Sequence, residues 1–217
     1  MSSDMTLLLI KSLGQTLYMV SISMIIAAVI GIPLGILLVT TAKGQILECV
    51  AFNRIIAGLV NAVRSIPFII LMVAIIPFTR SIVGTSIGTT AAMVPLTLAA
   101  IPFIGRQVEN SIKEVPYGLI EAALSLGATP LQIIKHVLLP EALSSIISQL
   151  TTVVIGLIGA SAMAGTIGGG GVGDLAIRYG YQRFRPDIML ITVIILVVVV
   201  QLVQFIGNYI AARLNKK

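Results

Sequence analysis

Five long apolar stretches, separated by short polar segments, dominate this chain of 217 residues. Each reaches or exceeds the roughly 20 residues that a helix needs to cross about 30 Å of hydrocarbon. The predicted membrane-spanning helices cover residues 13–42, 55–79, 87–107, 143–164 and 188–212. The pattern therefore predicts an all-α, polytopic membrane protein with a single transmembrane domain over residues 1–217.

The fourth span differs from the others because its first half is polar. This half carries six hydroxyl or amide side chains, namely Ser144, Ser145, Ser148, Gln149, Thr151 and Thr152. Such side chains in a membrane bundle hydrogen-bond to other helices or line a pathway, so we expect this half to face away from lipid. Prolines in the spans and the pair Gly31 and Gly35 are compatible with tight packing and with helix movement alike.

The composition indicates that lipid is the natural solvent of this chain. Apolar residues make up 57%, charged residues make up 10%, and the mean hydropathy is +1.08, whereas soluble domains carry roughly 25% charged residues. The net charge of +6 does not indicate nucleic-acid binding, because the 14 Lys and Arg are dispersed between apolar runs. Dispersed cations in a membrane protein usually set its orientation.

Five spans would place the two termini on opposite sides of the membrane. One side then carries eight cations: Lys43, Arg54, Arg106, Lys113, Lys135, Arg213, Lys216 and Lys217. The other side carries five, which are Lys11, Arg80, Arg178, Arg183 and Arg185, while Arg64 lies within a span. Because Lys and Arg are enriched in cytoplasmic loops, we expect the 43–54 loop, the 107–142 loop and the C-terminus in the cytoplasm. The N-terminus is then outside.

The predicted cytoplasmic loop over residues 114–140 has a local structure of its own. Residues 119–126 are rich in good helix formers, and Gly127 fits the position just past a helix end, where a left-handed backbone is favoured. The segment 129–132 is a capping box with Pro130 at the first helical position. We therefore expect two short helices that meet at a glycine corner. The first is apolar, so it should have a partner surface.

The same loop resembles the EAA loop of ABC-importer permeases, which reads EAA, three residues, Gly, nine residues and then I-x-L-P. Glu121-Ala122-Ala123, Gly127 and Leu139-Pro140 match this pattern, and Val137 replaces the usual Ile. In that family the loop forms a coupling helix that sits in a groove of the ATPase subunit. The resemblance implies that five residues couple this chain to an ATPase: Glu121, Ala122, Ala123, Leu124 and Gly127.

Other segments are similar to the permeases of methionine importers within this family, and the similarity covers essentially the whole chain. They are residues 64–71, 76–80, 82–88, 108–110, 161–163 and the glycine run that follows. The resemblance implies a type I ABC importer permease in the bacterial inner membrane, built as a homodimer of five-helix subunits. It also implies two cytoplasmic ATPase subunits that bind ATP and Mg, and an external methionine-binding protein. Methionine would cross at the homodimer interface by alternating access.

The sequence provides no set of residues for chemistry in this chain. No GxxxxGK[ST] segment is present to hold the phosphates of a nucleotide. The single His136 and the single Cys49 cannot form a metal site or a disulfide framework by themselves. We therefore expect no cofactor, no metal and no enzyme activity here, with ATP hydrolysis on a separate subunit.

Four residues are candidates for a gate or a pathway: Arg64, Met163, Gly165 and Gly169. A charge within a span faces protein or water, so Arg64 either lines the pathway or makes an ion pair or carbonyl contact that holds the dimer. The run 165–173, Gly-Thr-Ile-Gly-Gly-Gly-Gly-Val-Gly, is a gate, a docking surface or a flexible connector. Met163 has a soft, unbranched side chain that suits an outer gate and also suits a packed core.

Three alternatives remain open from the residues alone. The first is the same architecture serving another polar amino acid or small solute. The second is an ion-driven secondary transporter, which predicts ionisable groups in mid-span, where only Arg64 comes close. The third is a membrane assembly subunit without transport, which does not account for the prolines together with the glycine run.

Overall fold

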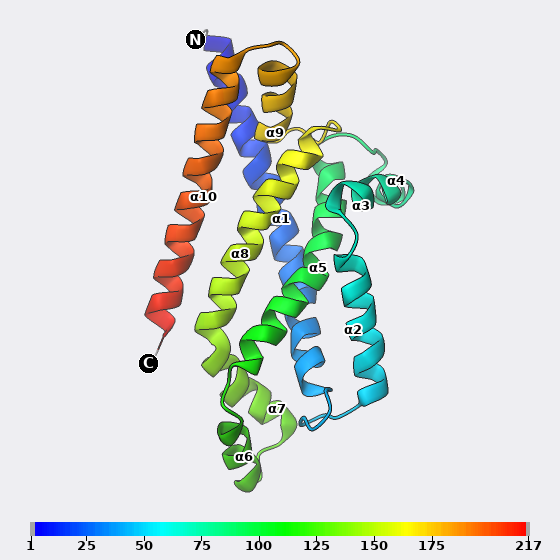
Figure 1. Cartoon of the computed structure of the whole chain (residues 1–217), viewed down its shortest axis with the longest axis vertical. Coiled ribbons are helices and arrows are strands. Elements are labelled where there is room, and N and C mark those ends of the chain that lie inside the picture. The colour runs from blue at the N-terminus through cyan, green and yellow to red at the C-terminus, as the bar shows by residue number, and fades with distance from the viewer. Residues whose placement is uncertain (1–2, 216–217) are drawn as a thin grey trace. The chain divides into compact units, whose positions relative to one another are not determined.

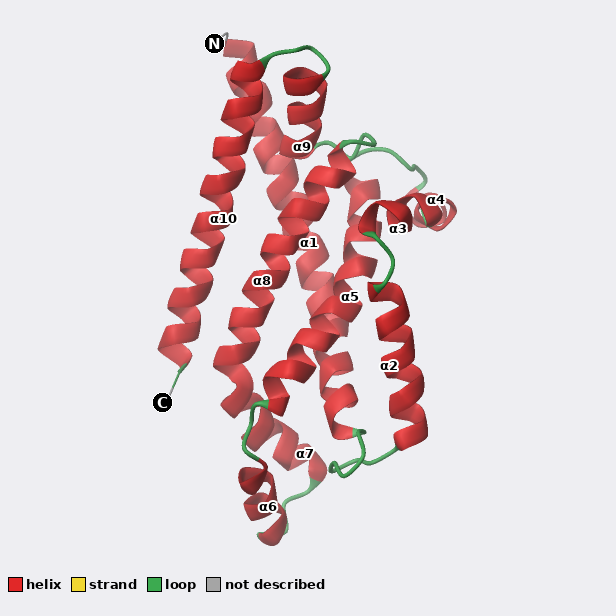
Figure 2. Ribbon diagram, in the orientation of Figure 1, coloured by secondary structure: helices red, strands yellow, loops and turns green. Residues whose placement is uncertain are grey.

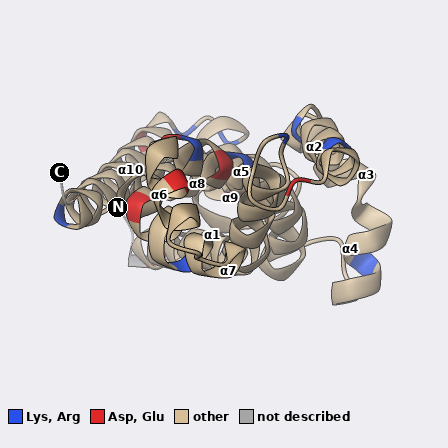
Figure 3. Ribbon diagram, turned by 90° about the horizontal axis from the view of Figure 1, so that it is seen from below, with Lys and Arg blue, Asp and Glu red and all other residues tan. Residues whose placement is uncertain are grey.

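A computed structural model describes residues 3–215 and shows a helical protein with no strand among those residues (Figure 2). Lys216 and Lys217, which contribute to the predicted orientation, lie outside the described residues, as do the first two residues of the predicted domain. Charged residues are sparse along the ribbon (Figure 3). This sparseness agrees with the apolar composition.

Four long helical runs match four of the predicted spans (Figure 1). They contain α1 (Ser3–Thr40), α5 (Thr89–Lys113), α8 (Leu139–Gly165) and α10 (Pro186–Leu214). Each run is long and apolar enough to cross a membrane. The shorter elements are α2 (Val50–Arg64), α3 (Phe68–Ala74), α4 (Ile76–Val83), α6 (Tyr117–Ser125), α7 (Pro130–Ile133), η1 (Ile134–Leu138), α9 (Gly171–Leu175) and η2 (Ala176–Tyr181).

The stretch predicted as the second span, residues 55–79, is not one continuous helix. Helix α2 ends at Arg64, and α3 starts after Pro67 at an angle of 98° to α2. Pro67 has no N–H group and disfavours helical backbone in the residue before it, which explains the break. The bent pair together still has the length and composition of one span, so the described chain has four or five candidate crossings.

The fourth span begins earlier than the predicted residue 143. Helices α7 and α8 form one helical run from Pro130 to Gly165, joined by the π-helical turn η1. This turn ends two residues before Pro140, whose ring would clash with a carbonyl of the preceding turn of an α-helix. The wider π register accommodates such local irregularities. The second helix of the loop is therefore continuous with the span.

The chain divides into two compact units. The first unit comprises Met1–Ala27, Ile66–Ala100 and Val154–Gln204, and the second comprises Ala28–Ser65, Ile101–Val153 and Phe205–Lys217. Helices α1, α5, α8 and α10 therefore each contribute one part to each unit. A buried cluster of Met5, Leu9, Leu175 and Ile188 lies within the first unit.

Close approach between α1 and α5 organises the second unit. A Cβ atom placed on Gly31 would lie 2.7 Å from the Cβ of Ile104, and one on Gly35 would lie 2.6 Å from the carbonyl oxygen of Gly105. These distances are shorter than real contacts, so only glycine allows the two helices to pack this closely. Both glycines serve tight packing in this structure.

The polar first half of α8 contacts α5 and α10, as its composition predicts. Ser145 donates a hydrogen bond to Ser111 at 3.1 Å, and Ser144 donates to the carbonyl oxygen of Ala211 at 2.8 Å. Thr151 lies so close to Gly207 that a side chain there would collide with it. Ser144, Ser145 and Thr151 therefore serve helix packing, whereas Ser148 and Thr152 are exposed in the single chain.

Candidate functional site

The EAA segment lies on the short helix α6, whose end is formed by local hydrogen bonds. Gly127 has the predicted left-handed backbone, with φ of 78°. Its N–H group donates to the carbonyl of Leu124 at 2.9 Å, and the N–H group of Ala128 donates to Ala123 at 3.1 Å. This pair of bonds is a Schellman motif, which satisfies the last carbonyls of a helix. The predicted conformation of Gly127 is therefore confirmed.

The start of α7 also has its predicted geometry. Thr129 is the N-cap residue with extended backbone, and Pro130 occupies the first helical position. The side-chain oxygen of Gln132 accepts a hydrogen bond from the N–H group of Thr129 at 2.8 Å, as in a capping box. The corner between α6 and α7 is thus built from residues close in sequence.

Helix α6 exposes an apolar surface although it is only nine residues long. Ile120 is buried and anchors the helix, whereas Leu124 is 46% exposed and Leu126 is 89% exposed. Glu121 and Ala122 are exposed beside them. An apolar surface of this kind, combined with small side chains that permit close approach, is typical of a binding site for another protein.

The glycine run after α8 forms an ordered loop within the first unit. Gly168, Gly170 and Gly171 all have positive φ, with values of 88°, 77° and 82°. The N–H group of Gly88 donates to the carbonyl oxygen of Gly168 at 2.9 Å. Gly169 lies beside the end of α8, where its N–H group donates to the carbonyl oxygen of Ala164 at 3.0 Å. The backbone conformation explains why glycine recurs here.

Two polar residues of α1 hold this loop, and the sequence reasoning missed them. The side-chain oxygen of Gln15 accepts from the N–H group of Gly171 at 3.0 Å. The hydroxyl of Thr16 accepts from the N–H group of Val172 at 2.9 Å, and both of these residues are buried. Adjacent Gln and Thr within an otherwise apolar stretch were the available signal. These bonds argue against a flexible connector.

The candidate gate residues of the first unit lie close together in the chain and in space. Met163 is 50% exposed in the last turns of α8, and Gly165 is the last residue of that helix. A side chain at Gly165 would collide with the backbone of Asp174, so α8 and α9 approach here without room for one.

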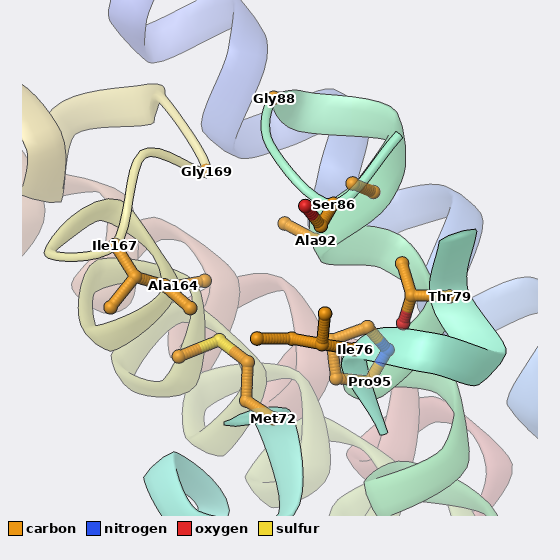
Figure 4. A pocket seen from close by; sticks show the side chains of 11 residues that line it. Met72, Ile76, Thr79, Ser86, Gly88, Ala92, Pro95, Ala164, Ile167 and Gly169 are labelled. Carbon is orange, nitrogen blue, oxygen red and sulfur yellow. The ribbon is translucent and has the colours of Figure 1, made fainter. Parts of the chain in front are cut away.

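A small pocket lies beside this loop, lined by residues that include Met72, Ile76, Pro95, Ala164 and Ile167 (Figure 4). Its volume of about 20 Å³ is enough for one water molecule. Methionine is far larger, so this pocket is not a substrate site in this conformation.

Arg64 belongs to the second unit, where it is exposed at the last position of α2. Its guanidinium carbon lies 5.6 Å from the centre of the Phe103 ring, within range of a cation–π interaction. Phe103 was not singled out from the sequence. A neighbouring network of charges includes Arg106. Its guanidinium donates hydrogen bonds to the carboxylate of Glu109 at 2.5 Å and to the amide oxygen of Asn61 at 2.6 Å. Lys113 completes it, at 2.6 Å from Glu109.

The segment between α9 and α10 carries cations and aromatic rings. Asp174 forms an ion pair with Arg178 and raises the pKa of its guanidinium. The hydrogen bond between them is the larger cause, and charge attraction is the smaller one. The guanidinium carbon of Arg183 lies 4.4 Å from the centre of the Tyr179 ring.

Among residues 3–215, no three His, Cys, Asp or Glu side chains are grouped as a metal ion would need.

The sequence of this chain is similar to those of known transport proteins. Residues 31–217 match the family described as "Binding-protein-dependent transport system inner membrane component". The chain is 54% identical to the "Probable D-methionine transport system permease protein MetI" of Vibrio cholerae, over 97% of this chain and 93% of that protein. It is 52% identical to the "D-methionine transport system permease protein MetI" of Escherichia coli K12, over 76% of each chain.

A solved structure of the MetNI methionine ABC transporter in inward-facing conformations contains a chain of the same fold. The TM-score is 0.98 at 47% identity, and the match covers 100% of both chains. The family match extends over most of the chain, and the full-length relatives share about half of its residues. The chain therefore belongs to the family of inner membrane components of binding-protein-dependent transport systems.

Proposed function

We propose that this chain is the membrane-spanning permease subunit of an ATP-driven importer of methionine. Two copies of the chain form the translocation unit in the bacterial inner membrane, and methionine crosses at their shared interface by alternating access. Family membership and the similarity to methionine permeases over nearly the full length support this function. An external methionine-binding protein delivers the substrate.

The exposed helix α6 is the observation that carries the energy-coupling part of the proposal. Its apolar surface and its small side chains suit a groove on a cytoplasmic ATPase subunit. Five residues form this contact: Glu121, Ala122, Ala123, Leu124 and Gly127. ATP and Mg are bound by two ATPase subunits, and their closure moves α6. Because α7 and α8 form one helical run, the corner at Gly127 can pass this movement to α8.

The proposed orientation has the N-terminus outside and the C-terminus in the cytoplasm. It requires five crossings, so α2 and α3 together form one bent crossing. The excess of Lys and Arg on the side of α6 supports it. Met163, Gly165 and Gly169 then belong to the outer gate, and Arg64 lines the pathway.

Reconstitution tests this function directly. The purified permease should retain a cytoplasmic ATPase subunit, and vesicles containing this complex and the binding protein should take up labelled methionine only with ATP. Unlabelled methionine should compete better than histidine, which separates the proposal from import of another amino acid. Uptake that needs an ion gradient and no ATP would identify a secondary transporter and defeat the proposal.

A further inference from the structure

The environment of Arg64 indicates a binding site for an anion. This residue ends α2, directly before the break at residues 65–67, where α2 and α3 meet at 98°. Its side chain is exposed, and its guanidinium lies over the ring of Phe103. A charge within a membrane span is costly in contact with lipid and normally faces protein or water. The guanidinium therefore faces the second copy or the pathway.

Within the described part of the chain, Arg64 has no carboxylate partner. Among residues 3–215, the ion pairs within 4 Å do not include Arg64. Glu109, within α5, is already paired with Arg106 and Lys113. The other seven acidic residues lie in loops, in the short helices α6 and α9, or near the ends of the long helices: Asp4, Glu48, Glu114, Glu121, Glu141, Asp174 and Asp187. A second copy carries the same eight acidic residues, so it cannot supply a free carboxylate in mid-span either.

We infer that Arg64 binds the α-carboxylate of the transported amino acid, and that Phe103 contacts its thioether side chain. This inference rests on the proposed function. Guanidinium groups bind carboxylates through two parallel hydrogen bonds, and a guanidinium stacked on a ring keeps its N–H groups available. Thioether sulfur makes favourable contacts with aromatic rings. The pair thus matches both ends of methionine.

Two other arginines of the second unit, Arg106 and Arg54, are less suited to this role. Arg106 already donates to Glu109 and to Asn61. Arg54 lies ten residues before Arg64 on the same helix, in the part of α2 next to the predicted cytoplasmic loop. Arg54 therefore provides a matched control, because it changes the same charge on the same element away from the proposed site.

Ligand protection of a nearby thiol tests the inference on the intact complex with its ATPase. The exposed Cys49 is replaced by Ser, and Ser65→Cys places a thiol next to Arg64. Methionine should slow maleimide labelling at concentrations about tenfold to hundredfold lower than methioninol, which lacks the carboxylate. Arg64→Gln should abolish this difference, Arg64→Lys should reduce it, and Arg54→Gln should preserve it.

The proposed contact between Phe103 and the thioether of methionine is tested separately. Norleucine has the length of methionine without its sulfur, so Phe103→Leu should reduce the preference for methionine over norleucine by about twofold to tenfold. The preference for methionine over methioninol should remain in this variant. Equal changes for both ligand pairs would indicate a general packing defect and would contradict the assigned role of Phe103.

Two results overturn the inference on Arg64: no preference for the carboxylate in the parent complex, or an unchanged preference in Arg64→Gln. Labelling without ligand shows that each variant presents the same accessible thiol. ATP-driven methionine uptake is measured in the same preparations. Normal uptake without a carboxylate preference defeats this inference alone, whereas absence of ATP-driven uptake in the parent defeats the proposed function.

Discussion

The N–H group of Ala128 donates to the carbonyl oxygen of Ala123 at 3.1 Å, and this bond closes the end of α6 around Gly127. A Cβ atom on Gly127 would meet nothing within 4 Å inside the chain. The glycine is therefore required for its backbone, with φ of 78°, and leaves open space for a partner. The corner can be tested without disturbing a packed core.

Gly127→Asp should abolish methionine uptake while the permease is still inserted in the membrane. The substitution adds a charge where the ATPase groove is proposed, at a left-handed backbone position that Asp and Asn both tolerate. Uptake by vesicles and the amount of inserted permease measure the two effects. Gly127→Asn is the neutral control, since Asn tolerates this backbone, and it should retain more uptake. Normal uptake by the Asp variant would contradict the coupling role.

Gly35→Ala should destabilise the permease, because the new methyl group would lie 2.6 Å from the carbonyl oxygen of Gly105. Overpacking of this kind costs roughly 1–3 kcal/mol. Gly14→Ala is the matched control on the same helix, because nothing lies within 4 Å of its added Cβ. Thermal unfolding of the purified complex should show a lower midpoint for Gly35→Ala only. Equal midpoints for both variants would mean that α1 and α5 are not in close contact.

Thr16→Val should loosen the glycine loop, because the buried N–H group of Val172 loses its acceptor. An unsatisfied buried donor costs roughly 1–3 kcal/mol, and Val has nearly the shape of Thr. Hydrogen exchange of the Val172 amide should become faster in Thr16→Val. Thr16→Ser keeps the hydroxyl and should exchange at the parent rate. A slow amide in the Val variant would show that the loop is held by other contacts.

Met163→Ala should raise ATP hydrolysis in the absence of binding protein, or allow methionine to leak across vesicles. The half-exposed side chain is proposed to close the outer gate, and Ala is too short to do so. Met163→Leu has a similar volume and should keep hydrolysis and leak near the parent values. Unchanged hydrolysis and leak in Met163→Ala would remove this residue from the gate.

Local and compositional features of this protein can be read from its sequence. The apolar runs predict the long helices because the hydrophobic effect acts on each stretch separately. Gly127 and the capping box at Thr129 were predictable because their hydrogen bonds join residues at most five positions apart. The EAA pattern could be recognised for the same reason, since its spacing belongs to one short segment.

Contacts between distant segments were decided by the tertiary structure. Thr16 meets Val172 across 156 positions, and Arg64 meets Phe103 from another helix, although no spacing in the chain relates these pairs. The sequence predicted one span over residues 55–79, and the break at Pro67 with its angle of 98° appeared only in the structure. Propensity and hydropathy act over a few residues, whereas the choice of partner depends on which helix faces meet. The sequence therefore determined the helices and the segment that matches the EAA pattern, and the fold alone decided which polar residues hold the loop and which ring lies beside Arg64.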